Sequence, residues 1–388
     1  MYYSLDIFST VVGEHYMKIL FAVDSFFQLI EATNLRMTVF KDEEADIFIY
    51  SSTPNSNAIC QNLIESKLFN KCVLVNSPLL HCGSSFSFFK KFPKYFIYLY
   101  TLISPKKYVQ NVLNCDKLNY DLFLFSGVGA VTECIFNAIF KVNRKIRCYR
   151  FEDSYVSYTR EYGKTKGAFR IIFERLMYKF FGGTEIDGYI DGYYFADPDL
   201  VTTTFNYPII RAPKISRNNT KLVNVLNKVF NFSKIEDSYK EKYIFFEYGD
   251  SYFEKNDEDI DFVKELVAIV GQDSVLIKRH PRFKNNRFSK TGANFTKSSS
   301  IPWELIQLNI KMDNKIFITT TSAAALTSSV YFNDDCKSIL LFEMMVNKPS
   351  SVNNVVRDYF VRFQNKYGKD SLAVPKSKDE FLKLIKEN

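Results

Sequence analysis

Five consecutive residues, Lys278-Arg279-His280-Pro281-Arg282, combine side chains that could stabilise a departing phosphate. They follow an apolar run, Ser274 to Ile277, which predicts a strand. Because proline restricts the residue before it to extended geometry, we expect His280 on a turn and not inside a helix. In α/β sheets ligands bind at the carboxyl ends of strands, and a proton donor among fixed cations suits the charge that grows on a leaving phosphate. A basic surface turn without a ligand is the alternative that these residues leave open.

A second candidate anion site follows the predicted strand Ile316 to Ile318. The chain there runs from Thr319 to Leu326, with hydroxyl side chains followed by small residues that predict the start of a helix. Free N–H groups and hydroxyls at a helix N-terminus bind anions, and alanines let a phosphate approach closely. We therefore predict phosphate contacts from Thr321, Ser322 and Ala323. Simple capping of the helix is the alternative role, and it is compatible with anion binding.

Carboxylates follow two further predicted strands. Glu152-Asp153 comes after Ile146 to Tyr149, and Asp250 comes after Tyr243 to Phe246, where Glu247 is also a candidate. A carboxylate at this edge of a sheet can deprotonate a hydroxyl group or hold the hydroxyls of a sugar. Isolated acidic residues are common, so each of these signals is weak when taken alone.

Several familiar sites are absent from the sequence. The turn Ser126-Gly127-Val128-Gly129 lacks the third glycine of a dinucleotide fingerprint, because Thr132 stands there. No HExxH, Walker lysine loop or GxSxG elbow occurs. The seven cysteines form no CxxC pair and no cluster with histidine, which argues for free thiols in a reducing compartment and against a structural zinc.

The elements that must position these residues alternate along the chain. Short apolar runs separated by helical or polar stretches predict parallel sheets flanked by helices: Ile19–Val23, Ile47–Tyr50, Cys72–Asn76, Leu122–Phe125 and Ile146–Tyr149, then Tyr243–Phe246, Val275–Ile277, Ile316–Ile318 and Ile339–Phe342. Asp257–Val270 and Phe381–Ile385 are predicted helical. We expect an N-terminal extension (1–16), an α/β domain (17–207), a polar and basic linker (208–242) and a second α/β domain (243–388), with a cleft between the domains.

Composition points to a globular protein with acidic ligands. The chain has 388 residues, 46% hydrophobic and 24% charged, with a net charge of +8. No apolar run is long enough to span a bilayer, and the first sixteen residues do not resemble a signal peptide, so a cytoplasmic protein is expected. We find no signature of a nucleic-acid-binding module.

Two basic and aromatic segments have a composition that lets them lie on an anionic membrane surface. In one, lysines bracket the aromatic residues between Phe86 and Tyr108; they are Lys90, Lys91, Lys94, Lys106 and Lys107. In the other, Arg170, Arg175 and Lys179 alternate with Phe169, Ile172, Phe173, Leu176 and Phe180. Ordinary packed helices with a solvated basic edge are the alternative.

Taken in order, five motifs resemble those of the bacterial sialyltransferases of glycosyltransferase family 52, the lipooligosaccharide and capsule type. They are Phe151 to Tyr158, Gly249-Asp250, His280-Pro281-Arg282, Ser298 to Glu304, and Ser322 to Thr327. The resemblance covers about Glu152 to Thr327. One departure is Ser154, which follows the acidic pair where the family has glycine.

The resemblance implies an α/β, GT-B-like fold with two Rossmann-like domains facing a cleft, the C-terminal one binding cytidine nucleotide and the N-terminal one facing the acceptor. It implies inverting, metal-independent transfer of sialic acid from CMP-sialic acid to a terminal galactose of a surface glycan, with an α-2,3 linkage expected. No metal or other cofactor is needed.

The resemblance also implies roles for individual residues of this chain. Asp250 looks like the general base for the acceptor hydroxyl. His280, next to Pro281 and Arg282, looks like the group that stabilises or protonates the leaving CMP phosphate. Glu304 is expected to hold the ribose hydroxyls.

Ser322, with the backbone N–H behind it, is expected to bind the phosphate, with Thr321 and Ala323 on either side. Asp153 is the alternative base, because a related sialyltransferase family takes its base from this acidic pair. Glu152 and Asp153 are both expected to contact the acceptor.

The implied partners are a CMP-sugar donor and a lipid-linked glycan ending in galactose. The two basic segments add an anionic membrane surface, at the inner face of the plasma membrane, as a further expected partner. Members of the family can be dimers, so we also expect a homodimer, and no nucleic acid. The alternatives are a transferase that uses CMP-Kdo, another CMP-nonulosonate or a CDP-polyol. From a different class, a non-catalytic glycan-binding scaffold remains open.

Overall fold

The computed structural model describes most of the chain. The described residues are 16–50, 55–76, 92–113, 118–159, 168–233, 239–249, 257–280, 283, 285–297, 301–346, 348–349 and 352–387. Three residues of the predicted site, Asp250, Pro281 and Arg282, lie outside them, as do Ser298 to Ser300.

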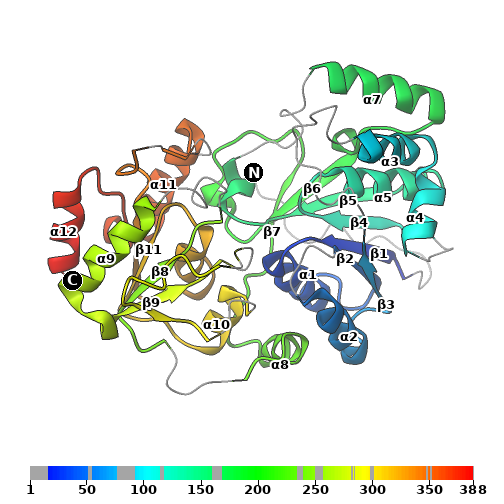
Figure 1. The fold of residues 1–388 in the computed structure, drawn as a ribbon. Helices are drawn as coiled ribbons and strands as arrows, with labels where there is room; N and C mark the ends of the chain where they lie inside the picture. The colour runs from blue at the N-terminus through cyan, green and yellow to red at the C-terminus, as the bar shows by residue number, and fades with distance from the viewer. Residues whose placement is uncertain are drawn as a thin grey trace. The chain divides into compact units, whose positions relative to one another are not determined.

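The first sheet is parallel throughout and, within the described residues, has seven strands in the order β3-β2-β1-β4-β5-β6-β7 (Figure 1). Its strands are β1 (Lys18–Val23), β2 (Glu44–Tyr50), β3 (Lys71–Val75), β4 (Leu122–Phe125), β5 (Arg147–Phe151), β6 (Ile190–Phe195) and β7 (Ile209–Arg211). The helices of this part of the chain are α1 (Phe26–Thr38), α2 (Ser56–Ser66), α3 (Phe92–Ile103), α4 (Pro105–Leu113), α5 (Ala130–Phe140), α6 (Tyr155–Thr159), α7 (Ala168–Phe181) and α8 (Thr220–Val229).

The second sheet is also parallel, and its six strands within the described part of the chain run in the order β10-β9-β8-β11-β12-β13. They are β8 (Tyr243–Phe246), β9 (Val275–Lys278), β10 (Asn294–Phe295), β11 (Lys315–Thr319), β12 (Cys336–Leu340) and β13 (Leu372–Ala373). The accompanying helices are α9 (Glu258–Val270), α10 (Trp303–Asn309), α11 (Asn354–Tyr367) and α12 (Lys378–Lys386).

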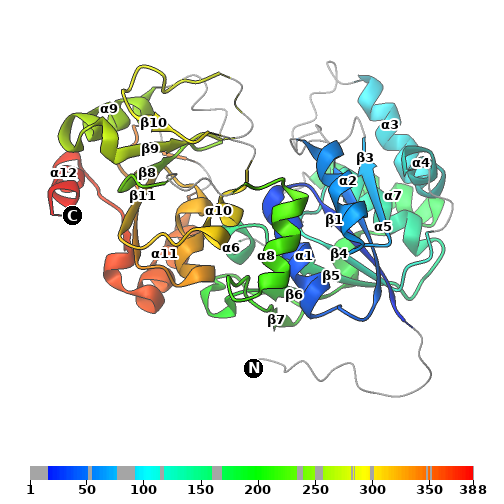
Figure 2. The same cartoon turned by 90° about the horizontal axis from the view of Figure 1, so that it is seen from below.

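Both faces of the second sheet are covered, which is why its strands are continuous apolar runs. Along β8, Phe245 points into a core that also contains residues of α9 and α12. Phe246 points to the other face, where Trp303 of α10 lies edge-on with a ring separation of 4.8 Å. Figures 1 and 2 show α9 and α12 on one side of β8 and β9 and α10 on the other.

The chain divides into two compact units. The first contains residues 1–198, 203–213 and 224–230, and the second contains 199–202, 214–223 and 231–388. The segment 208–242, which we predicted as a linker, contains β7 and α8. The domain boundaries given above stay a prediction.

Four strands were missed from the sequence, and each has a local reason. In β6, Asp191 and Gly192 interrupt the apolar pattern. A Cβ atom at Gly192 would lie 2.9 Å from Ile210 and from Tyr149, so a larger residue there would displace these neighbours. β7 has three residues, and β10 and β13 have two each, which is too short for a pattern.

One predicted helix is wrong. After Ser322 the chain forms a 3₁₀ turn, Ala323–Ala325, and then a π-turn, Ser328–Phe332, in place of an α-helix. The alanines are too few to continue a helix before hydroxyl and β-branched residues follow. An argument from a helix dipole therefore does not apply at this site.

Candidate functional site

Three neighbouring strands of the second sheet bring the predicted phosphate-site residues to one edge. β8 lies between β9 and β11, and all three are parallel. Glu247 follows β8, His280 follows β9, and Thr320 to Ser322 follow β11. Because carboxyl ends of parallel strands meet at the same edge, the histidine turn and the hydroxyl turn flank the end of β8.

The His280 imidazole lies directly against the backbone of Gly249. A Cβ atom placed on Gly249 would be 2.6 Å from both Cε1 and Nε2 of the ring. The backbone N–H of His280 donates to Oε2 of Glu247 at 2.9 Å, and its carbonyl accepts from the N–H of Phe283 at 3.1 Å. The ring is therefore held over the residue that precedes Asp250. Sequence reasoning did not find this role of Gly249, because it depends on a contact between two strand ends.

Gly249→Ala is expected to displace the His280 imidazole, because the added methyl group needs the space of the ring. The ring is half-buried and can turn outward, so the free energy of unfolding should fall by only about 1 kcal/mol or less. The chain has three histidines, and the signals of His280 can be identified in a proton–carbon NMR spectrum as those missing from His280→Ala. These signals should shift in Gly249→Ala.

Gly188→Ala is the matched control, since a methyl group there meets nothing within 4 Å. Its histidine signals should stay in place. Unchanged His280 signals in Gly249→Ala would contradict the packing of the ring on Gly249.

Glu247 holds the histidine turn by accepting the backbone N–H of His280. Its side chain is buried, and burial raises the pKa of the carboxyl group, opposed by the N–H of His280 and by the charges of Arg287 and Arg279. Arg287 also donates to Asp259 at 2.6 Å, where burial raises the pKa of Asp259 to about 6 despite the arginine. Two arginines and two acids thus surround the base of the turn. We assign Glu247 a positioning role.

The hydroxyl turn after β11 is tied to β8. Thr319 Oγ1 donates to the carbonyl of Phe246 at 2.9 Å and accepts the N–H of Ser322 at 3.2 Å. Ser322 Oγ in turn accepts the N–H of Ala324 at 3.4 Å, which confirms its predicted capping role for the short 3₁₀ turn. The hydroxyls of Thr320 and Thr321 are buried and have no hydrogen-bond partner among the described residues. Buried hydroxyls of this kind call for a partner, and a bound anion is one candidate.

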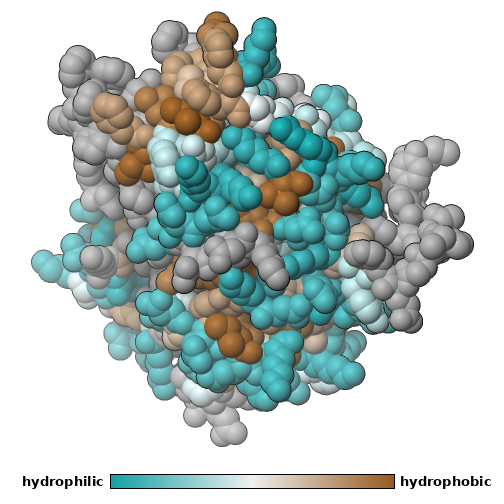
Figure 3. Space-filling model, turned by 90° about the vertical axis from the view of Figure 1, so that its right-hand side faces the viewer, coloured by the Kyte–Doolittle hydropathy of each residue, from teal (hydrophilic) through white to brown (hydrophobic). Residues whose placement is uncertain are grey.

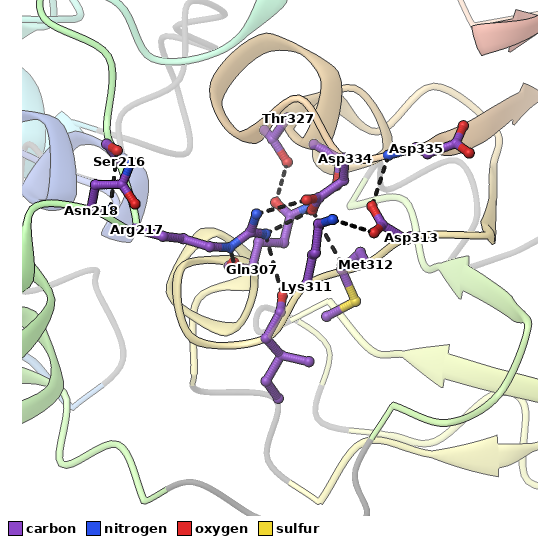
Figure 4. Close-up of polar contacts among 12 residues, drawn as sticks. Ser216, Arg217, Asn218, Gln307, Lys311, Met312, Asp313, Thr327, Asp334 and Asp335 are labelled. Carbon is purple, nitrogen blue, oxygen red and sulfur yellow. Dashed lines mark hydrogen bonds and ion pairs between the residues drawn. The ribbon is translucent and has the colours of Figure 1, made fainter.

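A polar network around Arg217 connects, through Thr327, to the 3₁₀ turn that follows Ser322 (Figure 4). Arg217 donates to both carboxylate oxygens of Asp334 at 2.7 Å and to the carbonyl of Gln307 at 2.7 Å. Thr327 Oγ1 lies 2.7 Å from Gln307 Oε1 and 2.9 Å from the carbonyl of Ala324, inside the 3₁₀ turn. Thr327 and Ala324 belong to motifs found in the sequence. The roles of Arg217, Gln307 and Asp334 were not predicted, because their contacts join segments about 20 to 117 positions apart.

Glu304 lies in the first turn of α10, next to a buried lysine. Lys278 Nζ donates to the carbonyl of Ile301 at 2.8 Å. Burial lowers the pKa of Lys278 to about 8, and the negative charge of Glu304 opposes this shift. Glu304 itself is half-buried. This electrostatic interaction between Lys278 and Glu304 links the start of α10 to the end of β9, the strand that precedes His280.

The acidic pair belongs to the first unit, at the carboxyl end of β5. The Glu152 carboxylate is buried and accepts the N–H of Ala196 at 3.1 Å, at the end of β6. Asp153 is half-buried and accepts from Oγ of Ser25, the residue that caps α1, at 3.1 Å. Both carboxylates therefore hold neighbouring loops together. Their predicted contacts with an acceptor stay a prediction.

The turn from Ser126 to Gly129 leads from β4 into α5, in agreement with the tight strand-to-helix turn expected there. Arg150, on β5, is completely buried and donates to the carbonyl of Ser126 at 2.9 Å and 2.6 Å. Its guanidinium carbon also lies 4.5 Å from the ring centre of Tyr193. A buried arginine in the middle of a sheet was not expected from the sequence, and it holds this turn in place.

No protein-family model and no curated protein match the chain. Solved structures do. The glycotransferase of kitacinnamycin superposes with a TM-score of 0.54, covering 96% of this chain and 90% of that one at 8% identity. An α/β-galactoside α-2,3-sialyltransferase from the luminous marine bacterium Photobacterium phosphoreum superposes with a TM-score of 0.52, covering 92% and 98% at 13% identity.

Identities this low show the fold alone. The predicted fold class is confirmed: the chain is α/β and GT-B-like, with two Rossmann-like parallel sheets. Among the described residues, no helix is both long enough and apolar enough to cross a bilayer. The same residues contain no group of three or more His, Cys, Asp or Glu side chains that could hold a metal ion.

Proposed function

We propose that this protein is a glycosyltransferase that moves sialic acid from CMP-sialic acid to a terminal galactose of a surface glycan, with inversion and without a metal ion. The observation that carries the proposal is the placement of His280. Its imidazole is held against Gly249, immediately before Asp250, and across the end of β8 from the hydroxyl turn of Thr321 and Ser322. A fold shared with a sialyltransferase supports it.

The chemistry of the leaving group explains this arrangement. When the bond between C2 of sialic acid and the phosphate oxygen breaks, the electron pair stays on the phosphate of CMP. A hydrogen-bond donor placed in advance at that oxygen lowers the barrier. His280 supplies the donor or the proton, and Thr321 and Ser322 supply hydroxyl contacts to the phosphate.

The acceptor needs a base on the other side of the reacting carbon. Its galactose hydroxyl loses a proton as its oxygen attacks C2. Asp250, directly after Gly249, is our choice for this base, and Asp153 is the alternative. Glu304 holds the ribose hydroxyls of CMP, near the nucleotide end of the site.

The decisive experiment incubates the purified protein with CMP-sialic acid and lactose or N-acetyllactosamine in the presence of EDTA. We expect free CMP and a sialylated product in equal amounts. Release of CMP without a sialylated product would support CMP-sialic acid as the donor and reject lactose and N-acetyllactosamine as acceptors. Absence of any CMP release, with consumption of CMP-Kdo or of CDP-glycerol in parallel reactions, would replace the proposed donor.

A further inference from the structure

Helix α7 turns an apolar stripe toward solvent. Ile172, Leu176 and Phe180 are spaced by four residues, so they share one face of the helix, and 60%, 51% and 79% of their surfaces are exposed. Single exposed apolar residues are normal in proteins, but a continuous row of three on the outer face of one helix is not.

Internal contacts fix which face of α7 points outward. Glu174 and Tyr178, on the opposite side of the helix, are buried. The hydroxyl of Tyr98, in α3, donates to the carboxylate of Glu174 and ties the two helices together. The stripe is therefore the solvent face of a docked helix.

Helix α3, which packs against α7, carries exposed apolar side chains of its own. Phe96, Tyr100 and Ile103 recur at helical spacing and are all exposed, whereas Tyr98 and Leu102 are buried. We call the six exposed side chains the α3–α7 surface; they are Phe96, Tyr100, Ile103, Ile172, Leu176 and Phe180. Figure 3 views the side of the molecule that carries these helices, and hydrophobic side chains gather at the top of the view, where α7 lies.

Cations surround the α3–α7 surface. Arg175 and Lys179 lie on the outer side of α7 beside the apolar stripe, and both are exposed. Lys141 donates to the carbonyl of Ile103 at the end of α3, and Arg144 donates to the carbonyl of Gly182 just after α7. Lys106 and Lys107 add two exposed charges at the start of α4. Glu174 is buried on the inner side of α7, and Glu185 pairs with Arg175 at 3.4 Å. The six cations outnumber these two acids, which leaves a positive excess in this part of the described chain.

We propose that the α3–α7 surface binds the interface of an anionic lipid bilayer, with the apolar side chains at the level of the acyl chains and the cations at the headgroups. An apolar stripe flanked by Lys and Arg is typical of helices that bind such a bilayer, because the apolar side chains enter the interface and the cations attract the anionic headgroups. The proposal is independent of the catalytic site, since all these residues belong to the first unit and none lies at the end of a strand.

Charge argues against a second copy of the chain as the occupant. A symmetric dimer contact would place the same patch on both partners, and so would bring the six cations of one protomer against those of the other. Like charges in such a contact are costly. A negatively charged surface has no such penalty.

The test is co-sedimentation of the full chain with vesicles of phosphatidylcholine that do or do not contain phosphatidylglycerol. We expect binding to the anionic vesicles at low salt, weak binding to phosphatidylcholine alone, and release as salt is raised. The variant Arg175→Gln/Lys179→Gln should lower the partition coefficient roughly 30-fold, since each cation near an anionic surface contributes about a factor of five.

The apolar part is tested with Ile172→Gln/Leu176→Gln/Phe180→Gln, which should lower the partition coefficient at least about tenfold. Val361→Gln, an exposed valine of α11 in the second unit, is the matched control and should bind like the unaltered protein. All these side chains are exposed, so circular dichroism should show an unchanged fold.

A second measurement does not depend on sedimentation. In Phe180→Trp the new indole should shift to shorter emission wavelengths when anionic vesicles are added, against a constant signal from buried Trp303. The proposal is overturned if the unaltered protein does not bind anionic vesicles, or if the triple glutamine variant binds them as well as the unaltered protein does. A dimer in sedimentation velocity that the triple variant dissociates, without any vesicle binding, would assign the surface to self-association.

Discussion

His280→Ala should lower kcat for sialyl transfer by about 10²- to 10⁴-fold, the range expected for loss of a positioned acid–base group. The loss follows from the geometry: the ring lies between Gly249 and the turn at Phe283, and no other imidazole is present at the described edge of this sheet. KM for the donor should change less than kcat, because the interaction with phosphate strengthens as charge develops in the transition state.

The measurement compares kcat and KM for the unaltered protein, His280→Ala, Gly249→Ala and the double variant. If Gly249→Ala acts by displacing the ring, its effect should vanish in the His280→Ala background. Added imidazole should restore part of the turnover of His280→Ala. Turnover of His280→Ala close to that of the unaltered protein would remove His280 from the mechanism and favour the scaffold alternative.

Asp334→Ala should destabilise the second unit by about 3 kcal/mol or more. The Asp334 side chain has no exposed surface, and its loss leaves the Arg217 guanidinium without its two 2.7 Å bonds. The N–H of Met312, which also donates to this carboxylate, loses its partner as well. Removing one member of a largely buried ion pair is costly because the remaining charge, here that of Arg217, has little access to water.

The chain itself contains the probe for this measurement. It has one tryptophan, Trp303, which is buried in the core of the second unit. Urea unfolding followed by tryptophan fluorescence therefore reports the unit that holds Asp334. Lys311→Ala removes an exposed lysine that pairs with Asp313 in the same region (Figure 4), and it should leave the curve unchanged. Equal curves for Asp334→Ala and the unaltered protein would contradict the structural importance of the pair.

The sequence predicted the fold well where a strand is buried on both faces. Runs such as Leu122 to Phe125 and Tyr243 to Phe246 coincide with β4 and β8, because nothing polar interrupts them. The prediction failed where contacts between distant segments of the chain determine which residue can occupy a position. Gly192 weakens the pattern of β6, yet Tyr149 and Ile210 pack closely against that position, where glycine avoids a clash.

The site shows the same division. That His280 follows a strand could be predicted from proline at the next position and the apolar run before it. That its ring rests on Gly249 could not, because the two positions meet only when β8 pairs with β9. The helix expected after Ser322 was wrong because small residues allow a helix without requiring one, and the chain there forms a 3₁₀ turn.

The strand order of the first sheet also has a consequence during synthesis. β1 lies in the middle, between β2 and β4, and Ile19 pairs with Leu122. At the usual rate of translation, roughly 5 to 20 s pass between the emergence of Val23 and that of Leu122. For that interval β1 is an edge strand with apolar side chains on both faces, the kind of segment that pairs with other nascent chains. The most vulnerable moment of this protein is therefore expected on the ribosome, before the finished sheet exists.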